Sequence, residues 1–382
     1  MNKIQKTKWH SLCTGKLAKG CSQCVQGRKL VLFITGECAQ RCFYCPISEQ
    51  KFGKDIVYAN EWKIQDPNNP VELFEEANIT QASGAGITGG DPLMNIERCC
   101  QYIRLLKQKY GKEFHIHLYT PLKLITIEKL QKLYDAGLDE IRVHPNLDNN
   151  ALWDRLALLS KFQWHKGIEI PALPGYQEKT KKLLDFAAGK IDFINFNELE
   201  LSDTSIPHYA LHKMNFKPKD SLSYGVKGSK EMALEMLEYC KQKGINAHFC
   251  TAKLKDAIQV KNRLQIRAKN ICGDFEKNTG EGTIIRYCLY LPELSPGFSY
   301  REKLKAADKQ KTLAKLQQKK AELITALKLS EDEIKLDQLK FRLILNVNNK
   351  YPLSIIKKLN LKAAKVEEYP TADSMEVEIE FL

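Results

Sequence analysis

The sequence predicts an α/β fold built on a parallel sheet and followed by a smaller α/β region. From about residue 29 to residue 270, short apolar runs alternate with segments of helical periodicity, which is typical of repeated strand–helix units. A cysteine-rich segment precedes this pattern, and the pattern changes after residue 270. We therefore expect a cysteine-rich arm at 1–27, a main domain at 28–270 and a small α/β accessory domain at 271–382.

Seven short apolar runs are the expected strands of the main domain. They occupy residues 29–35, 84–88, 113–119, 139–144, 167–173, 191–199 and 245–250. Helical periodicity fills most of the intervals, at 70–82, 96–110, 126–136, 150–165, 176–188 and 229–243. Because repeated units of this kind give parallel strands, the carboxyl ends of the strands should meet at one edge, where we expect the chemistry.

The interval after the sixth strand, residues 200–228, has no helical pattern. Structureless loops longer than about 12–15 residues are usually functional or disordered. Since this one leaves a strand at the functional edge, we expect it to cover a substrate; a floppy insertion is the alternative.

The accessory domain is expected to mix strands and helices. Its predicted strands are 283–291, 341–347 and 375–381, and its predicted helices are a long lysine-rich segment at 300–328 and a short one at 353–358. It contains no catalytic motif, so substrate-recruiting, structural and oligomerising roles all stay open.

Three cysteines follow directly after the first predicted strand: Cys38, Cys42 and Cys45, with the spacing C-x3-C-x2-C. Four cysteines are the common ligand set of a four-iron cluster, so three thiolates in one loop would leave one iron open. This spacing, with Tyr44 before the last cysteine, resembles the signature of the radical S-adenosylmethionine (SAM) enzymes. A zinc knuckle is the alternative interpretation.

The resemblance implies a mechanism and a fold. The three thiolates would hold a [4Fe-4S] cluster whose open iron binds SAM, with Tyr44 near the adenine. Reductive cleavage of SAM would then supply a radical that abstracts hydrogen from a substrate. The implied fold is a partial (β/α)6-type barrel, here with an N-terminal cysteine-rich arm and a C-terminal α/β appendage.

A second motif, Gly89-Gly90-Asp91, ends the second predicted strand. It resembles the Gly-Gly-Glu-Pro motif of the same family, which implies contacts with the amino group of SAM. Glycines allow a close backbone approach, and a carboxylate suits an ammonium. Asp replaces the commoner Glu. A strand-to-helix turn is the alternative, since Pro92 suits the first turn of a helix.

Polar residues near the ends of later strands are further candidates for contacts with SAM. We favour His144, Asn146 and Glu169 for its ribose or carboxylate, although an inward polar residue can simply be hydrogen-bonded in the core. The segments 21–46 and 138–145 also resemble archaeal radical SAM proteins related to pyruvate formate-lyase activating enzymes. That resemblance covers roughly residues 20–270.

A possible second metal site lies upstream. The cysteine trio Cys13, Cys21 and Cys24 can close a tetrahedral zinc site with His10, or hold an auxiliary iron–sulfur cluster with a ligand from elsewhere, such as Cys250. Cys24 is expected at the bottom of the barrel and Cys250 at the top, a strand length of about 20 Å away, unless the arm folds upward. Reduced thiols in a flexible arm are the alternative.

Composition indicates a globular, cytoplasmic protein. The chain has 382 residues, 43% of them hydrophobic. No apolar run approaches the ~18 residues of a membrane span, and the basic N-terminus lacks the apolar stretch of a secretory signal. In such a protein, 12 cysteines favour metal binding over disulfides. Cys99, Cys100 and Cys240 lie in helical patterns and are expected to be buried small hydrophobes.

The net charge of +13 bears on partners. Residues 1–60 hold 10 Lys/Arg against 3 Asp/Glu, and residues 301–320 hold 8 against 2. These concentrations are compatible with a phosphate-facing surface or with solvated helix faces. The expected partners are an electron donor such as ferredoxin or flavodoxin and a macromolecular substrate, tRNA or protein, with a small metabolite as a further option. A non-enzymatic zinc or iron–sulfur protein that binds nucleic acid is the alternative function.

Overall fold

The computed structural model describes residues 3–382 and divides into two compact units. The first unit ends at Arg263 and the second begins at Leu264, so the division falls inside helix α9 (Lys261–Ile271), a little before the expected boundary at 270. The expected arm, residues 1–27, contributes strands and a helix to the first unit. Across the described chain, no helix is both long and apolar enough to cross a membrane.

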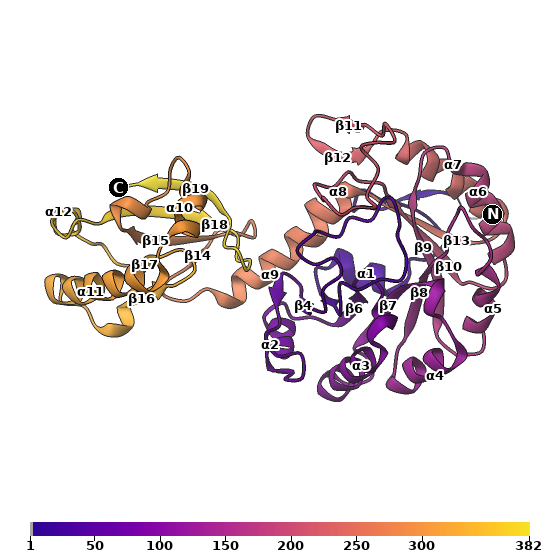
Figure 1. Cartoon of the computed structure of the whole chain (residues 1–382), viewed down its shortest axis with the longest axis horizontal. Coiled ribbons are helices and arrows are strands. Elements are labelled where there is room, and N and C mark those ends of the chain that lie inside the picture. Colours follow the sequence, from indigo (N-terminus) through magenta and orange to yellow (C-terminus); the bar gives the residue numbers. More distant parts are fainter. Residues whose placement is uncertain (1–2) are drawn as a thin grey trace. The chain divides into compact units, whose positions relative to one another are not determined.

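The first unit is an open, curved sheet with seven parallel strands at its centre (Figure 1). All seven expected strands are present: β3 (Lys29–Phe33), β6 (Gly84–Thr88), β7 (His115–Pro121), β8 (Glu140–His144), β9 (His165–Ala172), β10 (Phe193–Glu198) and β13 (Asn246–Cys250). They pair side by side in chain order. Antiparallel additions, β2 (Leu12–Thr14) on β13 and β4 (Tyr58–Ala59) on β3, extend the two margins, and β5 (Trp62–Lys63) pairs with β4. The partial-barrel prediction is confirmed.

Helices cover the outer face of this sheet (Figure 1). They are α2 (Val71–Ile79), α3 (Ile96–Tyr110), α4 (Ile127–Ala136), α6 (Gln177–Ala187) and α7 (Ser229–Gln242). Helix α3 shows why they pack there: Cys99, Cys100 and Ile103 recur at helical spacing, and all three are fully buried in the core. Cys240 is also fully buried, so the expectation for these three cysteines is confirmed.

The helix expected at 150–165 is much shorter than predicted. Only a 3-10 turn (Trp153–Arg155) and α5 (Leu156–Leu159) form. Phe162 and Trp164 turn inward and are buried, and the indole Nε1 of Trp164 donates to the Leu159 carbonyl at 3.1 Å. That contact satisfies a carbonyl at the end of α5. Strand β9 begins at His165, the residue after Trp164.

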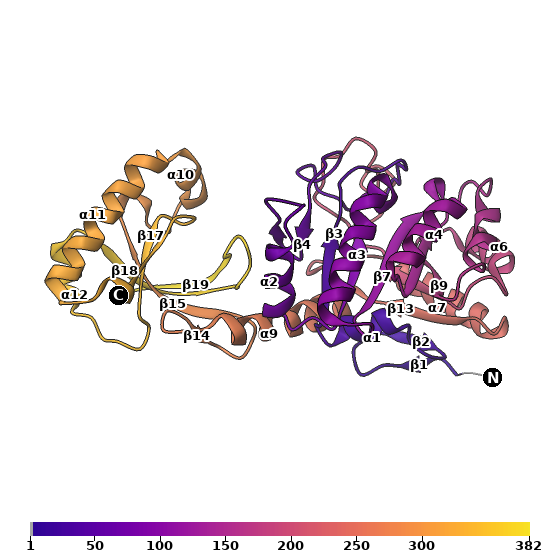
Figure 2. The same cartoon turned by 90° about the horizontal axis from the view of Figure 1, so that it is seen from below.

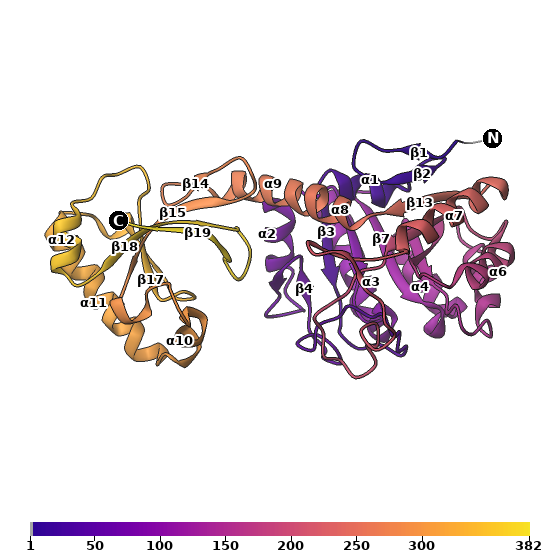
Figure 3. The ribbon, with the colours of Figure 1, turned by 90° about the horizontal axis from the view of Figure 1, so that it is seen from above.

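The N-terminal segment closes one end of the barrel. Strands β1 (Gln5–Lys6) and β2 (Leu12–Thr14) form a hairpin, and α1 (Lys19–Val25) lies across the barrel end (Figures 2 and 3). A Cβ at Gly20 would lie 2.6 Å from the Nδ1 atom of His117 and 2.8 Å from the guanidinium of Arg142. Only glycine therefore lets α1 approach the barrel interior so closely.

The insertion at 200–228 is ordered against the loop that carries the three cysteines. It contains a hairpin, β11 (Pro218–Asp220) and β12 (Ser223–Val226). The hydroxyl of Thr204 donates to the Ile47 carbonyl at 2.6 Å, and the backbone NH of Ala210 donates to the Phe43 carbonyl at 2.8 Å. The insertion therefore packs against the cysteine loop, as expected for a segment that covers a substrate. After β13, a short α8 (Ala252–Leu254) leads into a π-helical turn (Lys255–Val260).

The second unit is an antiparallel sheet with helices. Its strands are β14 (Lys277–Asn278), β15 (Ile284–Tyr290), β16 (Ile334–Asp337), β17 (Arg342–Leu345), β18 (Lys362–Glu368) and β19 (Glu376–Phe381), and its helices are α10 (Tyr300–Ala306), α11 (Lys309–Leu327) and α12 (Leu353–Lys358). The predicted long helix is broken before α11, where the Asp308 carboxylate accepts from the Lys311 NH at 3.0 Å and caps the new helix. The sequence pattern missed β14, β16 and β18.

Candidate functional site

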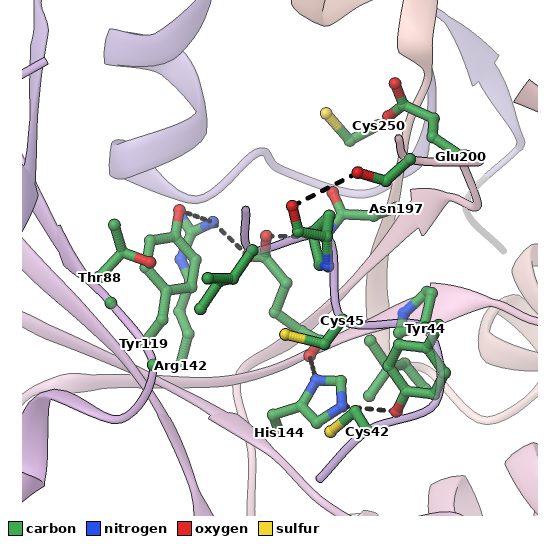
Figure 4. A pocket seen from close by; sticks show the side chains of 18 of the residues that line it. Cys42, Tyr44, Cys45, Thr88, Tyr119, Arg142, His144, Asn197, Glu200 and Cys250 are labelled. Carbon is green, nitrogen blue, oxygen red and sulfur yellow. Dashed lines mark hydrogen bonds and ion pairs between the residues drawn. The ribbon is translucent and has the colours of Figure 1, made fainter. Parts of the chain in front are cut away.

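A cavity of about 880 Å³ opens in the first unit where strand ends, loops and α1 meet. Its walls come from the cysteine loop after β3, the carboxyl ends of several strands, the insertion and α1 (Figure 4). Six cysteines line it: Cys21, Cys24, Cys38, Cys42, Cys45 and Cys250. The cavity therefore contains both groups of thiols that the sequence singled out, apart from Cys13.

The loop that carries Cys38, Cys42 and Cys45 is folded tightly onto itself. The backbone NH of Cys45 donates to the Cys42 carbonyl at 3.0 Å. Gln40 donates to two sulfurs, from its backbone to Cys38 at 3.4 Å and from its side chain to Cys42 at 3.3 Å. Donors aimed at sulfur stabilise thiolates and tune a metal centre, so the loop is arranged to hold three thiolates together.

Burial favours the protonated form of the three loop thiols when no metal is bound. Burial raises the pKa of all three thiols, and that of Cys42 to about 12, with further increases from its neighbours Cys45 and Cys38. Across residues 3–382, no three His, Cys, Asp or Glu side chains form a group that could hold a single metal ion.

The two glycines of the second motif hold the cysteine loop in place. A Cβ at Gly90 would lie 2.3 Å from the Glu37 carbonyl oxygen and 2.9 Å from the Cβ of Cys38. The backbone NH of Gly90 donates to the Thr35 carbonyl, and that of Asp91 to Glu37, each at 2.8 Å. Gly89 and Gly90 also line the cavity, so their backbones are available to a ligand.

Asp91 lies behind the cavity wall rather than on it. Its carboxylate is fully buried, and Oδ1 accepts from the Leu93 NH at 3.0 Å and from the Thr120 hydroxyl at 2.8 Å. Oδ2 has no hydrogen-bond partner, and burial raises the pKa of this carboxyl. Asp91 therefore caps the 3-10 turn Pro92–Asn95, and its expected contact with SAM stays a prediction.

Tyr44 and His144 are joined across the cavity (Figure 4). The Tyr44 hydroxyl lies 2.7 Å from Nε2 of His144, and Nδ1 of His144 lies 2.8 Å from the Glu169 carbonyl. Burial lowers the pKa of His144, so the ring is neutral, with Nδ1 donating to the carbonyl and Nε2 accepting from the tyrosine. The link fixes Tyr44 at the cavity wall, next to Cys45.

Glu169 supplies a charged carboxylate to the cavity. Burial opposes its charge, but Arg142 at 2.7 Å and Asn197 at 2.9 Å donate to its two oxygens and hold its pKa below the ordinary value. Arg142 also donates to Glu140 at 2.6 Å. Asn146, by contrast, is exposed and accepts locally from the Asp148 NH at 2.8 Å, so it is not part of the cavity wall.

The upstream cysteines Cys13, Cys21 and Cys24 do not all lie in the cavity. Cys21 and Cys24 line the cavity together with Cys250, whereas neither Cys13 nor His10 is among the lining residues. Cys13 lies in β2, opposite His248 of β13. The expected separation of Cys24 from Cys250 does not exclude them from one cavity, because α1 lies across the barrel end.

Sequence reasoning missed the three lysines of this cavity, Lys29, Lys51 and Lys255. Lys29 begins β3 and donates to the Tyr119 hydroxyl at 3.3 Å, and Lys255 pairs with Glu200. A lysine at the start of an otherwise apolar strand was the available signal for Lys29. Lys255 offered none, because it lies in a lysine-rich surface pattern.

Comparison with known proteins decides the family. A model of the radical SAM superfamily matches residues 32–159, which include all three loop cysteines and the glycine motif. MJ0021 of Methanocaldococcus jannaschii, provisionally named a glycyl-radical enzyme activating enzyme, is 41% identical over 280 residues, covering 71% of this chain and 73% of MJ0021. The chain belongs to the radical SAM superfamily. It is therefore an enzyme that uses a [4Fe-4S] cluster and SAM, and the non-enzymatic alternative has no support.

Two more distant proteins also match this chain. PqqA peptide cyclase of Bradyrhizobium diazoefficiens is 24% identical over 195 residues, 48% of each chain. The crystal structure of SuiB from Streptococcus suis with S-adenosylmethionine bound has a TM-score of 0.41 and 13% identity, covering 59% of this chain and 50% of that one. The chain spans about half the length of these two proteins.

Proposed function

We propose that this radical SAM enzyme acts on a protein, from which it abstracts a hydrogen atom of a glycine residue. The observation that carries the proposal is the 41% identity to a relative named as an activating enzyme of glycyl-radical enzymes, over 73% of that relative. When bound, the cluster and SAM supply the hydrogen-abstracting radical. The protein supplies the positions of the reactants and the exclusion of water.

Different residues of the cavity bind the cluster and SAM. Cys38, Cys42 and Cys45 hold the cluster, and the absence of a fourth cysteine from their loop leaves one iron for SAM. The backbones of Gly89 and Gly90 border the cavity beside that loop and suit the methionine end of SAM.

Two further groups suit the nucleoside end of SAM. The Glu169 carboxylate, oriented by Arg142 and Asn197, is a strong acceptor for ribose hydroxyls. The Tyr44–His144 pair fixes the wall on the adenine side. The insertion, bonded to the cysteine loop through Thr204, covers the reactants against water.

The proposed electron donor is a small acidic protein of the ferredoxin or flavodoxin kind. Arg41 and Lys54 of the cysteine loop are exposed, and so is Lys123, whose ammonium donates to the Ala39 carbonyl of that loop at 2.9 Å. A positive surface beside the cluster would steer an acidic donor to it. This steering weakens as salt is added.

The decisive experiment uses the anaerobically reconstituted protein with SAM and dithionite. We expect 5′-deoxyadenosine and methionine in equal amounts, and none from Cys42→Ala at equal protein concentration. Crosslinking in the native anaerobic host should capture a protein partner, and the reaction with that partner should give the electron paramagnetic resonance doublet of a glycyl radical. Recovery of RNA instead of protein would replace the proposed substrate class by tRNA.

A further inference from the structure

The hairpin of the insertion carries two strongly exposed apolar side chains. Leu222 lies in the turn between β11 and β12 and is 96% exposed, and Tyr224 of β12 is 63% exposed. Turn residues are usually small or polar, so an almost fully exposed leucine at this position needs a reason. Apolar side chains that are exposed close together are typical of interaction sites.

The hairpin is joined to the strand that leaves the barrel toward the cavity. The backbone NH of Val226 donates to the Leu199 carbonyl, and that of Leu201 donates to the Tyr224 carbonyl, each at 2.8 Å. Residues 199–201 therefore continue β10 as a further strand beside β12. Because Leu199 and Leu201 line the cavity, a partner bound to the hairpin lies beside the cavity. Figure 1 shows the hairpin at the edge of the first unit, near α8.

The two faces of the hairpin differ in their surroundings. A Cβ at Gly225 would lie 2.9 Å from a carboxylate oxygen of Glu198 and 3.1 Å from Nζ of Lys219, and these two side chains form an ion pair at 2.8 Å. Glu198 lines the cavity, so this face of β12 is turned toward the cavity. Since successive residues of a strand point to opposite faces, the ring of Tyr224 points away from the cavity. It is therefore available to a partner outside the cavity and not to SAM.

Hydrogen bonds within the turn fix the backbone that carries Leu222. The Asp220 carboxylate accepts from the Leu222 NH at 2.9 Å, and the Ser223 hydroxyl accepts from the Gly225 NH at 3.0 Å. An apolar anchor whose backbone is already ordered loses less conformational entropy on binding than one in a flexible loop. The hairpin thus presents Leu222 and Tyr224 in a conformation that is ready to bind.

The charge of the hairpin region indicates what kind of partner fits. Residues 211–228 contain four lysines but only one carboxylate, that of Asp220. Lys219 is paired with Glu198, whereas the other three lysines are exposed: Lys213, Lys217 and Lys227. A partner with carboxylates around an apolar pocket complements this surface. An RNA would suit the lysines but would leave Leu222 without an apolar contact, so a protein is favoured.

We propose that this hairpin is the docking site for the protein substrate, an inference that rests on the proposed function. Leu222 and Tyr224 enter an apolar pocket of the substrate, and the exposed lysines face carboxylates at the border of that pocket. Docking at this place holds the segment that carries the reactive glycine beside the cavity.

The first test identifies what the hairpin contacts. The full-length Leu222→benzoylphenylalanine variant is irradiated in an anaerobic extract of the native host, and the captured protein is then purified and mixed with wild-type enzyme, SAM and dithionite. We expect it to give the electron paramagnetic resonance doublet of a glycyl radical. The same photocrosslinker at Leu234, which is 36% exposed on α7, should not capture this protein. Equal capture from both positions, a captured protein that gives no glycyl radical, or capture of RNA or of a second copy of this chain would overturn the proposal.

The second test separates recognition of the substrate from the chemistry. Leu222→Ser/Tyr224→Ser should raise the KM for the captured protein about 30-fold, while kcat and the basal SAM cleavage without that protein keep their wild-type values. Leu234→Ser is the matched control and should leave the KM unchanged.

The lysines are tested by reversing their charge. Lys217→Glu/Lys227→Glu should also raise the KM and should weaken its dependence on salt. An unchanged KM in the Leu222→Ser/Tyr224→Ser variant would overturn the docking site. The proposed function would fail only if no partner captured from any position gained a glycyl radical, so the two failures can be told apart.

Discussion

Replacing Gly90 with alanine is expected to displace the cysteine loop while the barrel stays folded. The added Cβ would lie 2.3 Å from the Glu37 carbonyl oxygen and 2.9 Å from the Cβ of Cys38. Real carbon contacts begin above 3.0 Å, so one of the two backbones must move by close to an ångström. Overpacking of this kind costs about 1–3 kcal/mol, which is a fraction of the stability of a domain of this size.

The effect on chemistry should be much larger than the effect on folding. A displacement of about 1 Å in a positioning element can lower a rate about 100-fold. We therefore expect Gly90→Ala to lower the rate of SAM cleavage about 100-fold or to lose the cluster, with the far-ultraviolet circular dichroism unchanged. Formation of 5′-deoxyadenosine and iron content are the two assays.

The matched control is Gly273→Ala, since a Cβ at Gly273 meets nothing within 4 Å. This variant should cleave SAM at the wild-type rate. Wild-type cleavage and iron content in Gly90→Ala would refute the conclusion that the glycine motif holds the cysteine loop in place.

Three further changes test other parts of the structure. Asp91→Ala leaves the Thr120 hydroxyl and the Leu93 NH without their acceptor, and should lower the free energy of unfolding, measured by urea titration, by about 1–3 kcal/mol. An unchanged free energy of unfolding would show that the buried carboxylate does not contribute to stability. Burial holds the pKa of His117 well below 6.5, so below about pH 6.5 the unfolded chain binds a proton on this imidazole that the folded chain does not, and the free energy of unfolding falls. His117→Gln should reduce that fall, by at most about 1.4 kcal/mol per pH unit. An unchanged dependence of the free energy of unfolding on pH would contradict this. Glu368→Ala removes one of the two carboxylates that pair with the fully buried Arg342 and leaves it only Asp337. It should destabilise the second unit by about 3 kcal/mol while SAM cleavage by the first unit persists; a loss of cleavage with an intact second unit would contradict this.

The sequence was sufficient for the architecture of the first unit because its strands are buried on both faces. Apolar residues occupy at least alternate positions in these strands, as Ile116 and Leu118 do in β7, and all seven strands were found within a few residues of their observed ends. The cysteine loop and the glycine motif were found for a different reason. The spacing of their residues is set by local chemistry, so it can be recognised in the sequence without knowledge of the fold.

Features that depend on long-range packing could not be predicted. The position of α1 rests on Gly20 meeting His117 and Arg142, and no local pattern encodes that contact. It is this position that brings Cys21 and Cys24 into the cavity and leaves Cys13 outside. In the same way, the inward turn of Trp164 ended a helix that periodicity alone extended to residue 165.

Short-range polar contacts also decide how two of the candidate side chains are placed. Asn146 is a typical turn residue, and its side chain accepts from the Asp148 NH instead of facing the cavity. Asp91 follows the glycine pair as expected, but its carboxylate bonds to Thr120 and to the following turn. A side chain with a local backbone partner available often takes it in preference to a distant ligand.

The central claim is that Cys38, Cys42 and Cys45 hold a cluster with one iron left open for SAM. Mössbauer spectroscopy of the protein, reconstituted anaerobically with iron-57 and sulfide, tests it most directly. Addition of SAM should shift the signal of one iron site and leave the other three unchanged. A spectrum that SAM does not alter would contradict the claim, because every iron would then already have a ligand that SAM cannot displace.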